Sequence, residues 1–282
     1  MLIPPLVPRI VRKIIPPGLR VQLRRLEVVR NTAAKLLSGT AHCYFPDTQF
    51  ELFYDGYRNI GLGSGLSGFE CEERNMVRKL LTQKRPKVIW DIGANIGVWS
   101  LFLTSSCAAD AEIRCFEPDP RNLELLRLNM TKNQIANWII CPVAVSNQEG
   151  SATFFSDNVT GSTGTLEKDY DFIGKTYNAS RVKFQVTTTT VDCEISRGAR
   201  PPQFIKIDVE GFEYSVLQGA MRTLREYRPL LIFETQGDYG YHAEISKLFQ
   251  EVDYQMFDPS GKPVNSPVFN TIGVPREEKL LF

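Results

Sequence analysis

Four acidic residues each stand at the end of a short apolar run of the chain: Asp91, Glu117, Asp208 and Glu234. Carboxylates accept hydrogen bonds from hydroxyl groups, and a positioned carboxylate can take a proton from a reacting group. Apolar runs of about five residues are typical of buried strands. Because parallel strands gather their carboxyl ends at one edge of a sheet, the spacing predicts a single cleft lined by these acids.

The turn that follows Asp91 carries glycines at Gly93 and Gly97. A dinucleotide-binding turn has the pattern G-x-G-x-x-G, in which the second glycine lets the backbone approach a pyrophosphate. Asn95 occupies that second position, and Val98 occupies the third. Asparagine tolerates left-handed backbone angles, so the turn survives while the side chain fills the space of a diphosphate. The spacing therefore argues against a nicotinamide-dependent oxidoreductase, which stays a less favoured alternative.

The same turn, D-x-G-x-x-x-G, is similar to the loop by which class I methyltransferases hold S-adenosylmethionine (SAM). SAM has no phosphate, so a tight turn suffices for its methionine end. Glu117 follows the second apolar run and can accept hydrogen bonds from both hydroxyls of a ribose, each worth roughly 1.5–3 kcal/mol. We therefore expect SAM as the cofactor of this cleft.

Apolar runs alternate with helical patterns from residue 87 onward, as a parallel sheet covered by helices requires. The expected strands span 87–91, 112–116, 138–145, 204–208, 230–234, 254–257 and 269–274. One expected helix begins near residue 96, and two others cover 120–133 and 242–251. The prediction is an α/β fold: a doubly wound, seven-stranded, mostly parallel, Rossmann-like sheet. A β excursion at 150–192, with strands at 151–155 and 182–186, interrupts the alternation.

Three segments are predicted along the chain. They are a basic, Pro-rich amino-terminal arm with helical stretches (1–45), an accessory hairpin with a lead-in helix (46–86), and the sheet domain (87–282). Residues 1–30 hold seven basic residues against a single glutamate. Surface binding to an anionic membrane, an organelle targeting peptide and a basic arm folded back on the body all stay open. No run approaches the roughly 18 apolar residues of a membrane span, and we expect a cytoplasmic protein, with peripheral membrane contact through 1–30 as an alternative.

Charge and cysteine content exclude other classes of partner. The formal net charge is +1, so no global field favours nucleic acid, and no nucleic-acid partner is expected. The six cysteines are scattered without a C-x-x-C pair. They are expected to be reduced core residues of a cytosolic protein, not metal ligands or disulfides.

The fourth and fifth expected strands carry the candidate catalytic residues. The first and fourth strands are neighbours at the switch point of such a sheet, so their loops face one cleft. Lys206 shares a strand face with Asp208 and needs a buried partner, either Asp208 or Glu210. We predict that Asp208 or His242 takes a proton from the acceptor, with Glu210 orienting it and Glu234 beside it. A Mg²⁺ ion held by Asp208 and Glu234 is an alternative, although no metal is expected.

Several motifs occur together in the order seen in the FkbM family of SAM-dependent methyltransferases, which this chain resembles. They are Asp91–Gly97, Phe116-Glu117-Pro118, Ala144-Val145-Ser146, Ile205–Glu213, Leu217–Ala220, Phe233-Glu234 and Asn270–Pro275. The block I-K-I-D-V-E-G-x-E is the most specific of them. Gly68-Phe69-Glu70 is similar to the segment that leads into the family's first helix. The likeness covers 88–275 and leaves out 1–45.

This resemblance implies O-methylation of a hydroxyl on a sugar, glycolipid or secondary metabolite, so the partner would be a small-molecule or glycan acceptor. The residues that would hold SAM are Asp91, Gly93, Asn95 and Gly97 at the methionine end, Glu117 at the ribose and Ala144 under the adenine. Those that would border the acceptor are Asp208, Glu210 and Glu234. An N-methyltransferase on the same scaffold stays an alternative, although no (N/D)-P-P-(Y/F) turn follows the fourth strand. A non-catalytic module that only senses SAM is a further alternative.

Overall fold

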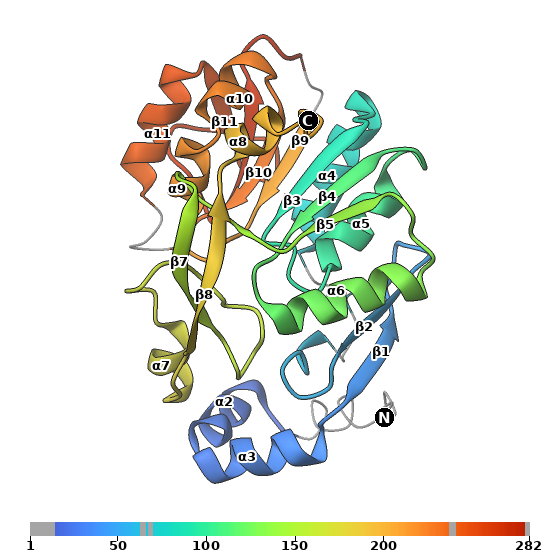
Figure 1. Ribbon diagram of the computed structural model, residues 1–282, viewed down its shortest axis with the longest axis vertical. Helices are drawn as coiled ribbons and strands as arrows, with labels where there is room; N and C mark the ends of the chain where they lie inside the picture. Colours follow the sequence, from blue (N-terminus) through green and yellow to red (C-terminus); the bar gives the residue numbers. More distant parts are fainter. Residues whose placement is uncertain (1–14, 63–65, 67–69, 237–240, 280–282) are drawn as a thin grey trace.

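The fold is a central sheet of eight strands, seen in a computed structural model that describes residues 15–62, 66, 70–236 and 241–279 (Figure 1). In spatial order the strands are β12 (Pro263–Val264), β11 (Tyr254–Phe257), β13 (Asn270–Pro275), β10 (Leu230–Glu234), β9 (Phe204–Ile207), β3 (Val88–Ile92), β4 (Glu112–Phe116) and β5 (Trp138–Cys141). Strands β10, β9, β3, β4 and β5 pair in parallel, whereas β13 is antiparallel to β10 and to β11. The predicted α/β class with a mostly parallel sheet is confirmed, and β3 and β9 are neighbours as expected.

The strand count differs from the predicted seven, and one predicted strand is divided. The additional strand is the two-residue β12, which pairs with the edge strand β11. The expected strand 138–145 ends in this sheet at Cys141, and β6 (Ala144–Val145) belongs to a separate three-stranded sheet. Pro142 lies between the two parts. Because proline has no N–H to donate, the ladder stops there and the chain changes sheets.

Side chains of the buried strands alternate between two helical layers. Ile89 belongs to one apolar cluster, whereas Val88, Trp90 and Ile92 belong to the other. The first layer contains α4 (Cys71–Lys84), α5 (Val98–Ser106) and α6 (Pro120–Lys132). The second layer contains α8 (Val191–Ser196), α9 (Glu213–Gln218), α10 (Met221–Glu226) and α11 (His242–Glu251). Both faces of the sheet are therefore covered, which leaves its carboxyl edge as the place for a ligand.

The predicted β excursion forms a second sheet. Strand β7 (Gly150–Ser156) pairs antiparallel with β8 (Val182–Thr189), and β6 pairs with β8 in parallel. Between β7 and β8 the chain forms the loop 157–170 and the short helix α7 (Phe172–Tyr177). Figure 1 shows this excursion extending away from the central sheet toward the amino-terminal helices.

The amino-terminal segment folds back on the body over its described part. Helices α2 (Pro17–Arg25) and α3 (Glu27–Leu36) precede a hairpin of β1 (Thr40–Tyr44) and β2 (Glu51–Asp55), and α2 lies beside α7 (Figure 1). Arg25 Nε donates to the carbonyl of Thr176 at 3.0 Å, and Arg30 Nη1 donates to the carbonyl of Tyr177 at 3.0 Å. Residues 1–14, with Arg9, Arg12 and Lys13, lie outside the described residues.

No helix in the described ranges is both long and apolar enough to pass through a bilayer. All six cysteines are free thiols. Cys115 and Cys141 are buried in β4 and β5, as expected, whereas Cys71 is exposed at the start of α4.

Candidate functional site

A cleft of about 500 Å³ opens at the carboxyl ends of β3, β4 and β9. This volume lies within the range of small-molecule sites, roughly 300–1,000 Å³. Seven of the ten predicted site residues line it: Gly93, Asn95, Glu117, Ala144, Asp208, Glu210 and Glu234. Asp91, Gly97 and His242 are not part of its lining in the described chain.

The turn after β3 packs directly on the backbone that follows β9. Gly93 has φ of +81°, and a Cβ placed there would lie 1.8 Å from the carbonyl oxygen of Asp208. Only glycine fits this contact. The amides of Gly93 and Ala94 both donate to the carbonyl of Phe116, and Asn95 has φ of +52°. The expected left-handed asparagine turn is therefore present, and it faces the cleft.

Asp91 and Gly97 support this turn from behind. Asp91 is fully buried, and its Oδ2 accepts a hydrogen bond from Ser100 Oγ of α5 at 2.5 Å. A Cβ on Gly97 would lie 2.8 Å from Leu126 Cδ1, so the glycine lets α5 approach α6. Both residues position the turn, and their assignment to direct cofactor contact stays a prediction.

Glu117 lines the cleft and is 4% exposed. Its carboxylate accepts from the amide of Asn95 at 2.9 Å and from the amide of Asp119 at 2.8 Å. Burial raises the pKa of Glu117 to about 7, although these amide bonds favour the ionised form. Each carboxylate oxygen has a second lone pair, so Glu117 can also accept bonds from a ligand.

Asn122 in the first turn of α6 is a lining residue that the sequence reasoning missed. It is 5% exposed, and its Oδ1 has no hydrogen-bond partner among the described residues. Ala144, with Val143, Val145 and Phe154, forms an apolar wall of the same cleft. An unpaired acceptor, a carboxylate and an apolar wall match the hydroxyls and flat ring of an adenosine, so these residues fit SAM.

The opposite side of the cleft is an ion-pair site at the end of β9. Lys206 Nζ donates to Asp208 Oδ2 at 2.9 Å and lies 3.7 Å from Asp91 Oδ1. Burial alone would lower the pKa of Lys206, but the Asp208 and Asp91 carboxylates raise it above its usual range. Lys206 is therefore a charged side chain between the two strand tips, and its predicted pairing with Asp208 is confirmed.

Glu210 and Glu234 are bridged by one amide. Gln236 Nε2 lies 2.9 Å from Glu210 Oε2 and 2.6 Å from Glu234 Oε1, and donates to both. The hydroxyl of Tyr170, from the excursion, donates to Glu210 Oε2 at 2.7 Å. Burial, then the Asp208 carboxylate, raises the pKa of both glutamates. Tyr170 of the excursion and Gln236 after β10 thus contact the carboxyl groups of Glu210 and Glu234, which hold protons more readily than exposed carboxyl groups do.

Glu70, just before α4, is a further acid, which the sequence indicated only as part of the motif Gly68-Phe69-Glu70. It lines the cleft, and its Oε2 accepts from Trp99 Nε1 at 2.6 Å. Burial, then the nearby Asp208 carboxylate, raises the pKa of Glu70 to about 7. Gly68 and Phe69 of the same motif lie outside the described residues. Pattern reasoning overlooked Glu70 because it stands in no strand and reaches the cleft only through the tertiary fold.

His242 begins α11, away from the cleft lining. Its Nε2 is buried and has no hydrogen-bond partner in the described ranges. No three His, Cys, Asp or Glu side chains are grouped as metal ligands within the part of the chain that the structure describes.

Comparison with known proteins adds to this geometry. The model of the methyltransferase FkbM domain matches residues 91–256, which is more than half of the chain. The chain belongs to the FkbM methyltransferase family. It is a methyltransferase, and the family implies SAM as the methyl donor. The chain is also similar to the hexuronic acid methyltransferase AglP of Haloferax volcanii, with 24% identity over 197 residues, which cover 64% of this chain and 75% of that protein.

Two solved structures are among the similar folds. One is methyltransferase FkbM from Methylobacillus flagellatus KT, with 18% identity, 67% of this chain and 43% of that chain covered, and a TM-score of 0.43. The other is a methyltransferase from Geobacter sulfurreducens, with 14% identity, coverage of 73% and 80%, and a TM-score of 0.44. This methyltransferase therefore spans less than half the length of the Methylobacillus protein.

Proposed function

We propose that this methyltransferase transfers a methyl group from SAM to a hydroxyl group of a sugar or glycan acceptor. One observation carries the proposal: a single cleft joins the Gly93–Glu117 side, which suits an adenosine, to a set of carboxyl groups that can take a proton. The similarity to a hexuronic acid methyltransferase supports a sugar as the acceptor.

The cofactor residues of the proposal lie on the β3–β4 side. The turn at Gly93 and Asn95 would hold the methionine end, with Asp91 and Gly97 fixing the turn from behind. Glu117 would accept from the ribose hydroxyls, and Ala144 would pack against the adenine. When bound, SAM supplies a methyl group activated by a sulfonium.

The chain's own contribution to the chemistry is a base near the acceptor oxygen. An alcohol is a poor nucleophile, and a positioned base contributes typically about 10²–10⁴-fold to the rate. We assign this role to Asp208, which lines the cleft while Lys206 fixes its Oδ2 at 2.9 Å. Glu70 lies in the same lining and has a pKa of about 7, so it can relay or share the proton near neutral pH. His242, the alternative base predicted from the sequence, does not line the cleft and is less favoured.

Glu210 and Glu234 would position the acceptor. A protonated carboxyl group has both a donor and acceptors, as a sugar hydroxyl does. The raised pKa values of these residues favour this form. Their bridge through Gln236 fixes both groups at one side of the cleft, which suits a molecule with several neighbouring hydroxyls.

The experiment that tests the proposal is methyl transfer from isotope-labelled SAM to a panel of neutral sugars, amino sugars and sugar acids. We expect label on oxygen, identified by the chemical shift of the methyl group in the product. Label on the nitrogen of an amino sugar would replace the proposal by the N-methyltransferase alternative. SAM binding by calorimetry without transfer to any acceptor of the panel would speak for a different acceptor class or a SAM sensor.

A further inference from the structure

The end of the cleft away from the β9 carboxylates is lined by two arginines. They are Arg24 of α2 and Arg58, which follows β2. Neither residue belongs to the segment 91–256 that identifies the family. The two ends of one cleft thus differ in the sign of the side chains that line them.

Arg58 is a buried cation with unused hydrogen-bonding capacity. It is 7% exposed, and its Nε has no hydrogen-bond partner among the described residues. Its Nη2 donates to the backbone carbonyl of Asp157 at 3.0 Å. A guanidinium has five N–H donors, and leaving a buried donor unpaired is costly. Arg58 also lines the cleft, so a ligand that brings acceptor atoms to its guanidinium can use donors that the protein leaves free.

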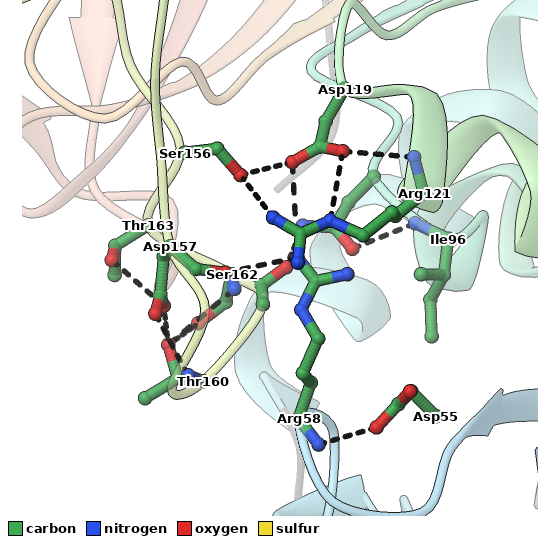
Figure 2. Close-up of polar contacts among 12 residues, drawn as sticks. Asp55, Arg58, Ile96, Asp119, Arg121, Ser156, Asp157, Thr160, Ser162 and Thr163 are labelled. Carbon is green, nitrogen blue, oxygen red and sulfur yellow. Dashed lines mark hydrogen bonds and ion pairs between the residues drawn. The ribbon is translucent and has the colours of Figure 1, made fainter. Parts of the chain in front are cut away.

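The Asp119 carboxylate near Arg58 also lies close to a second arginine, Arg121. Arg58 Nη2 lies 3.8 Å from Asp119 Oδ2, and Arg121 Nε lies 3.8 Å from Asp119 Oδ1. Figure 2 shows both arginines reaching toward this one carboxylate, which also accepts from Ser156 Oγ. Burial, then the nearby Arg121, lowers the pKa of Arg58. Asp119 therefore faces two guanidinium groups, and the carboxylates of Asp157 and Asp55 also act on Arg58 and favour its charged form.

Arg24 has no carboxylate in an ion pair with it within the described ranges. Its Nη2 donates to the carbonyls of Val159 at 3.0 Å and Tyr57 at 3.3 Å, and its guanidinium lies over the rings of Tyr57 and Tyr177. Carbonyl dipoles and ring faces stabilise the cation without neutralising it. Arg24 thus presents net positive charge to the cleft.

The loop that follows β7 packs closely on Arg58 through Gly161. A methyl group on Gly161 would come within 3.2 Å of Arg58 Nε and 3.0 Å of Asn59 Nδ2. The carbonyl of Gly161 accepts from Asn95 Nδ2 at 3.0 Å. The arginine end is therefore joined directly to the turn assigned to the cofactor, which is where an acceptor must approach.

We propose that Arg24 and Arg58 form a subsite for an oxyanion, a carboxylate or a phosphate, carried by the methyl acceptor. This inference rests on the proposed sugar methyltransfer and narrows its substrate to an anionic sugar. Arginine suits the role because its planar fork binds both oxyanions through paired hydrogen bonds.

Equilibrium binding tests the subsite without requiring turnover. The probes are methyl glucuronoside, methyl glucoside 6-phosphate and neutral methyl glucoside, titrated into the full chain in the presence of S-adenosylhomocysteine. We expect one anionic probe to bind at least about tenfold more tightly than the neutral one, because charge-assisted bonds are about twice as strong as neutral ones. The preferred probe distinguishes carboxylate from phosphate. Equal affinities for all three probes, or no binding by any, would overturn the inference.

Matched variants assign the effect to the cleft. Arg58→Gln and Arg24→Gln should each remove most of the preference for the anionic probe, and Arg58→Lys should retain part of it. The controls are Arg121→Gln, the neighbour that does not line the cleft, and Arg25→Gln, an exposed arginine of α2 with carbonyl partners only. Melting temperatures identify any variant that fails to fold. A preference that survives Arg58→Gln in folded protein would contradict the assignment.

Three further results separate the inference from the function on which it rests. Arg58→Gln could instead weaken S-adenosylhomocysteine binding by about tenfold and leave probe binding unchanged. The arginines would then bind the carboxylate of the cofactor, and the inference would fail. Labelled methyl transfer to the neutral glucoside with no anion preference would uphold the proposed function alone. Anion preference without any methyl transfer would uphold the subsite alone.

Discussion

The two ends of the cleft are built in different ways. The acidic end consists mainly of residues at the tips of neighbouring strands, Asp208 after β9 and Glu234 at the end of β10. The arginine end brings together α2, the segment after β2 and the loop after β7, which are far apart in sequence. The first arrangement follows from sheet topology, whereas the second exists only after the amino-terminal helices have docked. The end to which we assign the transfer chemistry is thus fixed by the sheet, and the end that we propose for an anionic acceptor depends on docked peripheral segments.

Of the changes that test this difference between the two ends, Asp208→Asn should have the largest effect, which is on turnover. It removes the assigned base from the acidic end, so turnover should fall by about 10²–10⁴-fold while SAM affinity changes little. Single-turnover methyl transfer and calorimetry measure the two quantities. The control is Asp110→Asn, which removes an exposed carboxylate paired with Lys87. Turnover within about twofold of wild type would mean that the strand tips do not supply the base.

The cofactor side is tested by Glu117→Gln. The amide keeps the shape of the side chain but loses a charge that is positioned for ribose hydroxyls, so SAM affinity should fall by about 10–100-fold. Turnover at saturating SAM should change much less than in Asp208→Asn. Unchanged SAM affinity would show that Glu117 only holds the amides of Asn95 and Asp119.

The pH dependence of kcat/KM tests whether Glu70 shares the acceptor proton. Its pKa of about 7 means that the ionised form predominates only above neutral pH. If Glu70 shares the proton, kcat/KM should rise with pH up to about 7 and then level off. Glu70→Gln should remove this ascending limb and lower the plateau by several-fold. A limb that persists in Glu70→Gln assigns the titration to another group.

The smallest expected effect is on stability, through Glu213 below the acidic end. Glu213 accepts from the amides of Val209 and Gly211, and burial raises its pKa from 4.5 to about 7. Between pH 4.5 and about 7 the folded state holds a proton that the unfolded state has lost, so the free energy of unfolding falls as pH rises. Denaturant titrations across this window should show a shallower slope for Glu213→Gln. The same slope in wild type and variant would contradict the burial argument.

Much of the fold and the turn after β3 were predictable because local pattern determines them. The acid-tipped strands, the asparagine turn at Asn95 and the α/β class follow from apolar runs and glycine spacing. The split of the expected strand 138–145 was missed because the effect of Pro142 within an apolar run is decided by tertiary pairing. Glu70 and Arg58 were missed because irregular segments bring them to the cleft. Asn122 was missed because nothing in the helical pattern of α6 marks a polar residue of its first turn as facing a ligand.

The position of Arg24 and Arg58 ahead of residue 91 has a consequence for how such enzymes diversify. The stretch by which the family is recognised runs from 91 to 256, and it contains Asp208 and Glu117 but neither arginine. Inheritance of the catalytic core and inheritance of substrate choice can then proceed separately. Replacement of the amino-terminal helices alone would let the same catalytic core act on a different methyl acceptor.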